Sequence, residues 1–222
     1  MSIVKEKQKR FNYKLKLFSM GSQSERGFTL GELLISIFIL SILTITVTSF
    51  QRDIFILNRT IDNNLTAQLE VRRITKVMVA ELRKSSVSSV GGYPISVAST
   101  SEIVFFSDIT SDGLKERVRY FLDNTKLKKG VTSPSGNPLV YNLGNESITT
   151  LISDVRASST QPIFQYFNED YSGSSLPLSF PVNIPDIRLV KITVIIDRDP
   201  VLPPAEIIGT SQVNLRNLKD NL

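Results

Sequence analysis

The side chain in this sequence that most clearly requires a partner is a carboxylate at the start of a long apolar run. Glu32 is followed by nineteen residues, Leu33 to Gln51, none of them charged and most of them Leu, Ile, Val or Phe. An ionisable group at a membrane boundary is costly, so a partner of opposite charge is expected. Just upstream, Gly27 and Phe28 place a small and an aromatic residue at the same boundary.

The composition excludes most catalytic arrangements. The chain contains no cysteine and no histidine, which removes thiol chemistry, disulfides, histidine general bases and imidazole zinc sites. Paired carboxylates stay open as catalytic groups, but no pair stands out. The sequence therefore predicts a protein that is not an enzyme and has no cofactor. A membrane-anchored hydrolase is disfavoured, because this chain contains neither a nucleophile motif nor a histidine.

The apolar run predicts a membrane helix. Nineteen residues at about 1.5 Å each give roughly 28 Å, close to the hydrocarbon thickness of a bilayer. A secretory signal peptide has an apolar core of about 7–15 residues that ends in small residues. Here the run is longer and continues through Thr46–Phe50 without a small-x-small site, so a signal peptide is disfavoured.

Gly27, the segment Phe28-Thr29-Leu30-Gly31-Glu32 and the apolar run together resemble the type IV prepilin signal. The resemblance implies that a prepilin peptidase cuts between Gly27 and Phe28 on the cytoplasmic side and methylates the new N-terminal Phe28. It also implies that Glu32 meets the amine of a neighbouring subunit and sets axial register during assembly. Because Glu32 lies one helical turn from Phe28, an intrachain pair is the alternative. An ordinary membrane anchor is the competing interpretation.

The net charge of +5 comes from the leader alone. Residues 1–27 contain seven basic and two acidic residues, and residues 28–222 contain nineteen of each. A basic segment before the first apolar helix favours a cytoplasmic N-terminus, which puts the following domain on the other side of the membrane. The mature chain is neutral, so no nucleic-acid partner is expected. The basic groups at Arg72–Lys76 and Lys126–Lys129 are interpreted as solvated faces or partners in salt bridges.

The helical pattern continues beyond the apolar run. No proline occurs between Phe28 and Tyr93, and apolar residues recur at spacings of three or four from Ile54 to Leu82. We predict one helix from about Thr29 to Lys84, apolar all round in its first half and amphipathic in its second. The expected organisation is a cleaved leader at 1–27, a transmembrane or filament-core half at 28–51, an amphipathic half at 52–90 and an extracytoplasmic β-rich domain at 91–222.

From residue 101 the apolar period becomes that of strands. In the segment Glu116–Leu122, alternation places Val118, Tyr120 and Leu122 on one face and Arg117, Arg119 and Phe121 on the other. Short connections favour an antiparallel sheet packed on the long helix, so the fold class is α+β and pilin-like. Strands are predicted at 102–107, 116–122, 126–131, 148–155, 163–167, 187–196 and 207–215.

The C-terminal region resembles the larger minor pilins, namely the PilW-like proteins and the J-type pseudopilins of type II secretion. The residues that carry this second resemblance are Glu81-Leu82-Arg83, Phe106-Ser107-Asp108 with Asp112-Gly113, Glu116–Gly130 and Val213–Leu218. Asp108, Asp112, Asp123 and Asn124 also suggest a Ca²⁺ site, but they lack the ligand spacing of an EF-hand loop, which favours solvated turns.

The sequence therefore predicts a minor prepilin-like subunit of a type IV pilus or a type II secretion pseudopilus, in the initiating or tip complex. The expected partners are the prepilin peptidase, the N-terminal helices of other minor pilins or pseudopilins, an inner-membrane assembly platform and membrane lipid. The helix would lie in the inner membrane before assembly. The alternative is a single-span, membrane-anchored extracytoplasmic binding domain that does not assemble.

Overall fold

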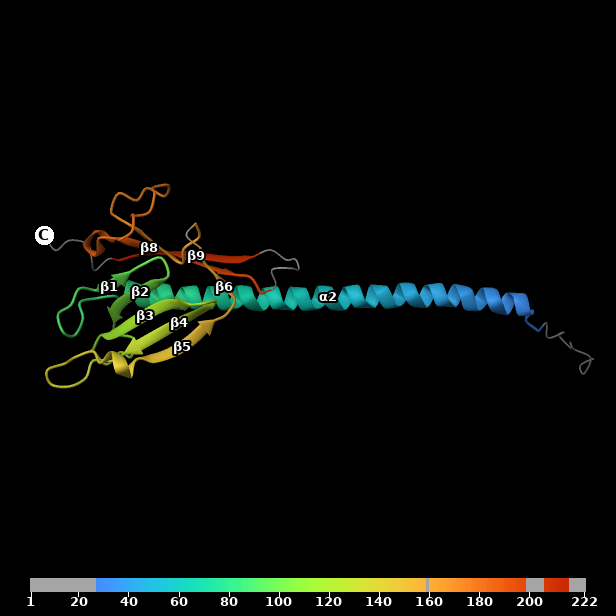
Figure 1. Ribbon diagram of the computed structural model, residues 1–222, viewed down its shortest axis with the longest axis horizontal. Helices are drawn as coiled ribbons and strands as arrows, with labels where there is room; N and C mark the ends of the chain where they lie inside the picture. Colours follow the sequence, from blue (N-terminus) through green and yellow to red (C-terminus); the bar gives the residue numbers. More distant parts are fainter. Residues whose placement is uncertain (1–26, 159, 199–205, 216–222) are drawn as a thin grey trace, which may run out of the picture. The chain divides into compact units, whose positions relative to one another are not determined.

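A computed structural model describes residues 27–158, 160–198 and 206–215 (Figure 1). The chain divides into two compact units, Met1–Ile56 and Leu57–Leu222. One helix, α2, extends from Leu30 to Arg83 and so contributes to both units. The predicted helix from Thr29 to Lys84 is confirmed to within one residue at each end. The basic leader of residues 1–26 lies outside the described residues.

The second half of α2 buries one stripe of side chains. The stripe is formed by Ala67, Val71, Ile74, Met78 and Leu82, which recur at spacings of three or four residues. That spacing keeps side chains on one face of a 3.6-residue helix. Arg72, Arg73 and Lys76, which lie between them, are exposed to solvent, so this half is amphipathic as predicted.

Two antiparallel sheets cover this stripe. The first sheet has five strands in the order β1-β2-β3-β4-β5, each paired with its neighbour along the chain. In β3, Val118 and Tyr120 are buried, whereas Arg119 between them is only partly buried, which confirms the predicted alternation at these positions. Leu122, predicted on the same face, is partly buried and packs against the core. The strands are β1 Ile95–Ala98, β2 Glu102–Ser107, β3 Glu116–Asp123, β4 Lys126–Thr132 and β5 Ser147–Ile152.

The second sheet is centred on β8. Strands β6 and β7 pair with successive parts of one side of β8, and β9 pairs with its other side along eight residues. These strands are β6 Val155–Arg156, β7 Phe164–Phe167, β8 Leu189–Ile196 and β9 Ile207–Asn214. Two short 3-10 helices, η1 Leu143–Asn145 and η2 Ile184–Asp186, lie in the connections.

The helix and both sheets share one hydrophobic core. In the unit Leu57–Leu222, Figure 1 shows α2 with β2–β5 on one side and β8–β9 on the other. The buried cluster joins Met78 of α2 to Phe105 and Tyr120 of the first sheet and to Tyr166 and Ile192 of the second. This confirms the α+β class, with a long helix packed against antiparallel sheets.

The strand predictions were wrong in three respects. The sequence suggested one sheet, whereas the structure has two. The predicted strand at 148–155 is divided between β5 of one sheet and β6 of the other, because Asp154 adopts a left-handed conformation with φ of 62° that turns the chain. Strand β1 was missed because it is only four residues long and directly follows Pro94.

A buried polar contact joins the end of α2 to the first sheet. The Glu81 carboxylate accepts a hydrogen bond from the Tyr120 hydroxyl at 2.6 Å and pairs with the Lys129 ammonium at 2.6 Å. Both charged side chains are about 85% buried, with exposures of 15% for Glu81 and 16% for Lys129. Burial and the neighbouring Glu81 charge raise the pKa of Tyr120. The contact therefore ties helix and sheet together in one geometry.

Candidate functional site

The N-terminal end of α2 is closed by a capping box. Thr29 precedes the first helical residue, and its hydroxyl oxygen accepts the backbone N–H of Glu32 at 3.2 Å. In return, Oε2 of Glu32 accepts the backbone N–H of Thr29 at 2.9 Å and the Thr29 hydroxyl at 3.0 Å. Such reciprocal bonds satisfy two backbone donors that a helix otherwise leaves unpaired. The Glu32 carboxylate therefore points back toward the N-terminus.

Phe28 and Gly27 lie just outside this cap. The Phe28 side chain is 82% exposed, and no atom lies within 4 Å of the position that a Cβ on Gly27 would occupy. Neither residue belongs to the helix, which begins at Leu30. The peptide bond between them is therefore outside the helix, between two residues that are both exposed.

The apolar half of α2 presents its side chains outward all round. Large apolar residues from Leu33 to Phe50 are about half exposed or more. Among the described residues this is the one helix long and apolar enough to cross a membrane. An apolar surface of this size has to be covered by lipid or by other helices.

The hydroxyl groups within this half are satisfied internally. Each donates to the carbonyl oxygen four residues earlier, which removes the cost of placing an unpaired donor in hydrocarbon. The small and hydroxylated residues also leave room for a second helix to approach closely. The bonded hydroxyls, with donor–acceptor distances, are Ser36 2.7 Å, Ser41 2.7 Å, Thr44 2.8 Å, Thr46 2.9 Å, Thr48 2.7 Å and Ser49 3.0 Å.

Replacing Thr29 tests the capping box directly. In Thr29→Val the side-chain acceptor for the Glu32 N–H is lost, whereas Thr29→Ser retains it. Loss of an N-cap destabilises a helix end by about 1 kcal/mol. We therefore expect the amides of the first helical turn to exchange with deuterium roughly fivefold faster in Thr29→Val than in the native chain or Thr29→Ser. Equal exchange in all three would contradict the cap.

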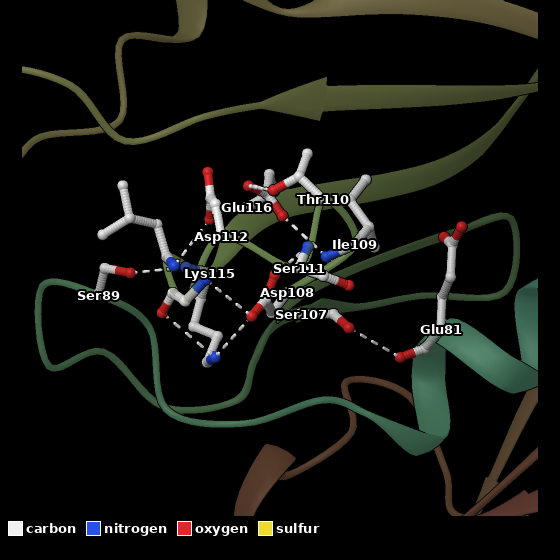
Figure 2. A network of polar contacts seen from close by, with 12 residues as sticks. Glu81, Ser89, Ser107, Asp108, Ile109, Thr110, Ser111, Asp112, Lys115 and Glu116 are labelled. Atoms are coloured by element: carbon white, nitrogen blue, oxygen red, sulfur yellow. Dashed lines mark hydrogen bonds and ion pairs between the residues drawn. The ribbon is translucent and has the colours of Figure 1, made fainter.

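The second group of candidate residues lies in the loop between β2 and β3 (Figure 2). Asp108 accepts hydrogen bonds from the backbone N–H groups of Ser111 at 2.6 Å and Gly113 at 3.1 Å, and it pairs with Lys115 at 3.5 Å. The Glu116 carboxylate is buried and accepts from the Ile109 N–H and the Thr110 hydroxyl. Both carboxylates therefore accept hydrogen bonds from their own loop and stabilise its conformation.

These bonds use the oxygens that a metal ion would need. Asp112 caps the backbone N–H of Leu114, and Asp123 pairs with Lys128 at 2.6 Å. Over the residues that the structure describes, no group of three or more acidic side chains is arranged to hold a metal ion. The four residues that suggested a Ca²⁺ site therefore lie in two separate turns, each with its own hydrogen bonds.

The Asp108 carboxyl makes the stability of the folded protein depend on pH. Partial burial raises the pKa of Asp108, but the donors from Ser111, Gly113 and Lys115 outweigh it and hold that pKa below its ordinary value of 3.8. A carboxyl with a lowered pKa contributes stability that is present above its unfolded pKa and lost as pH falls through its folded pKa.

We therefore expect the urea midpoint of the native protein to fall more steeply than that of Asp108→Asn as pH is lowered from about 5 to about 2. The measurement is a series of urea unfolding curves by tyrosine fluorescence. Parallel pH profiles for the two proteins would show that Asp108 does not stabilise the loop through its charge.

The basic groups identified in the sequence have different environments. Lys128 and Lys129 are each engaged in an ion pair, with Asp123 and Glu81. Arg72 and Lys76 on α2 make no hydrogen bond or ion pair with any described residue. Of the two predicted interpretations, Lys128 and Lys129 fit partners in salt bridges, and the exposed Arg72 and Lys76 fit a solvated face.

The structure places Gly27, Phe28 and Glu32 within one turn of the start of α2, as their spacing requires. Sequence reasoning missed the part played by Thr29, which joins Glu32 in the capping box. The signal was present, because Thr followed three residues later by Glu ahead of an apolar run is the capping-box pattern.

Comparison with known proteins bears on this same segment. The model of the prokaryotic N-terminal methylation motif matches residues 22–48, which span the junction, Glu32 and most of the apolar run. No curated protein matches the chain. A methylation motif lies at the start of the one helix, among the described residues, that is long and apolar enough to cross a membrane, and that helix packs on antiparallel sheets; together these findings support a type IV prepilin-like protein.

Proposed function

We propose that this protein is a minor prepilin-like subunit that is cleaved after Gly27, methylated on Phe28 and assembled into a type IV pilus or a type II secretion pseudopilus. The observation that carries the proposal is the match of residues 22–48 to the methylation motif. Its geometric support is the exposed, non-helical junction directly before the capped start of α2.

Cleavage would create a positive amine on Phe28 at the membrane boundary. Glu32 is the acidic residue in the first turn of α2, and only its Oε2 atom is engaged in the capping box. Oε1 makes no hydrogen bond with the described residues and is available to accept from an amine. A carboxylate–amine contact lowers the cost of desolvating both charges. The amine of a neighbouring subunit would make this contact a determinant of axial register.

We place the helix in the inner membrane before assembly, with the N-terminus in the cytoplasm. The excess of basic residues in the leader supports this orientation. The proposed organisation is a cleaved leader at 1–27, a lipid- or filament-embedded half at 28–51, an amphipathic half at 52–90 and an extracytoplasmic domain at 91–222. An inner-membrane platform would then move the subunit into the filament, where the exposed apolar helix packs on other helices.

A position in the initiating or tip complex is favoured over the repeating shaft. The two-sheet domain is large, and α2 contains no proline that would kink its apolar half. The likeness to PilW-like minor pilins and J-type pseudopilins supports the same position. The protein would act as a structural subunit and not as an enzyme.

The test is the mass of the N-terminal peptide of the protein isolated from its native membrane. A peptide that begins at Phe28 and carries one added methyl group, which raises its mass by one CH2, supports the proposal, and Gly27→Ala should leave the leader attached. Phe28→Leu is the matched control, because it alters the neighbouring side chain but keeps the glycine. An intact leader in cells that process their other prepilins would instead identify a membrane-anchored binding domain that does not assemble.

A further inference from the structure

The free edge of β9 lies beside α2 and borders a groove. One hollow of about 480 Å³ lies between Asn64–Arg72 of the helix and Glu206–Thr210 of the strand, and an adjoining hollow of about 290 Å³ lies between Arg72–Val79 and Gly209–Gln212. The order of these residues shows that β9 and α2 run side by side in the same direction, as Figure 1 also shows.

The backbone of β9 offers unpaired groups at this edge. Thr193 donates to Ile163 on the β7 side of β8, and Asp197 donates to Asp154 on the β6 side. The intervening residues of β8 therefore face β9 and bond to Gly209, Ser211 and Val213, their partners in the register.

It follows that the N–H and C=O groups of the alternate residues Ile208, Thr210 and Gln212 point away from β8. No described strand pairs with that side of β9. A row of unpaired donors and acceptors of this kind is a template for one more strand.

The helix side of the groove carries positive charge without a counterion. Arg72 and Lys76 line it and have no ion pair or hydrogen bond among the described residues. The acidic residues close to it are already occupied, since Glu70 pairs with Arg198 at 2.7 Å and Glu206 with Arg156 at 3.6 Å. An occupant that neutralises the groove must therefore bring its own carboxylates.

The spacing of the two cations matches a strand. Arg72 and Lys76 are four residues apart on α2, or about 6 Å along the helix axis. Alternate side chains of a strand project on the same face about 6.7 Å apart. A strand added beside β9 would thus direct every second side chain toward α2, and two acidic residues separated by one residue would meet the two cations.

We propose that the groove between β9 and α2 binds an extended acidic segment of another polypeptide chain, which adds to the free edge of β9 as a further strand. The backbone groups of Ile208, Thr210 and Gln212 supply the pairing. Arg72 and Lys76 select acidic residues at alternate positions. This surface lies outside the N-terminal signal, so its test does not depend on processing at Gly27.

The probe is a fluorescent peptide of sequence Thr-Glu-Val-Glu-Val-Glu-Thr, titrated into the full-length protein in detergent and followed by anisotropy. We expect saturable binding, slower deuterium exchange at Ile208, Thr210 and Gln212, and no binding of the same peptide with Lys in place of Glu. Methylating alternate backbone nitrogens of the peptide should abolish binding, because those N–H groups form the ladder.

Two variants of the protein separate the contribution of the ion pairs from that of backbone pairing along β9. Arg72→Ala with Lys76→Ala should weaken binding about threefold to tenfold, as expected for two exposed ion pairs. Thr210→Pro removes an outward N–H without breaking the β8–β9 ladder, and it should abolish binding where Thr210→Ala does not.

Several outcomes would overturn the proposal. These are no saturable binding at millimolar peptide, equal binding of the Lys and Glu peptides, or protection of residues away from β9. Concentration-dependent self-association that Thr210→Pro abolishes, without peptide binding, would assign the edge to a second copy of this chain instead.

Discussion

Glu32→Val and Glu32→Gln are both expected to give processed protein that accumulates in the membrane but enters filaments at no more than about one-tenth of the native level. The reason is the cost of leaving a buried amine without its carboxylate, which is several kcal/mol in a low-dielectric surrounding. The measurement is the amount of the protein in sheared or purified filaments, relative to the amount in membranes, by quantitative immunoblot.

The two variants distinguish the charge of Glu32 from its capping role. Gln at the third helical position can still accept the Thr29 N–H in a capping box, whereas Val cannot. If charge sets register, both variants fail to assemble. If only the cap matters, Glu32→Gln should assemble normally. Native incorporation of both variants would remove the proposed role of Glu32 altogether, while processing at Gly27 could still be correct.

The second large effect concerns Gly209, where β9 lies directly against α2. A Cβ added at this position would be 2.1 Å from Cγ1 of Val71 and 3.5 Å from its Cβ. Val71 is buried and β-branched, and a β-branched side chain in a helix has one strongly preferred rotamer. The contact therefore cannot be relieved by a side-chain rotation alone, and the strand or the helix has to shift.

Gly209→Ala should lower the free energy of unfolding by about 1–3 kcal/mol, the usual cost of overpacking. For a domain of this size that corresponds to a melting temperature lower by roughly 2–12 °C. The measurement is thermal unfolding of the full chain in detergent, followed by near-UV circular dichroism. Thr210→Ala is the control, because its side chain is exposed on the opposite face and should change stability little.

A double mutant tests the cause of this destabilisation. Val71→Ala removes the methyl group that a residue at 209 would meet, so Gly209→Ala with Val71→Ala should be less destabilised than the sum of the two single variants. Strict additivity would indicate that Gly209 is required for another reason. Such a result would also weaken the case for β9 as an edge held at a fixed distance from α2.

The apolar half of α2 contains six Ser and Thr side chains, and their hydrogen bonds explain how this half can lie in lipid. Their donors are bonded to backbone carbonyls of the same helix, so none has to find a partner in hydrocarbon. They are therefore compatible with both environments proposed for this segment, the bilayer before assembly and the helix bundle of a filament after it.

Local sequence patterns determined the candidate site and the long helix. The residues that specify the junction, the cap and Glu32 lie within six consecutive positions, Gly27 to Glu32, and the apolar period of α2 repeats every three or four residues. Interactions of this range are encoded in neighbouring residues and so can be inferred without a fold. The alternation of β3 was predictable for the same reason.

The tertiary structure alone decided how these elements meet. Which strands join which sheet depends on pairing between distant segments, as when β5 and β6 separate across the turn at Asp154. Glu81 finds Tyr120 and Lys129 at sequence separations of 39 and 48 residues, and Gly209 meets Val71 from the far end of the chain. A period in the sequence shows that a face is buried but does not name its partner, because any apolar surface of suitable shape satisfies it.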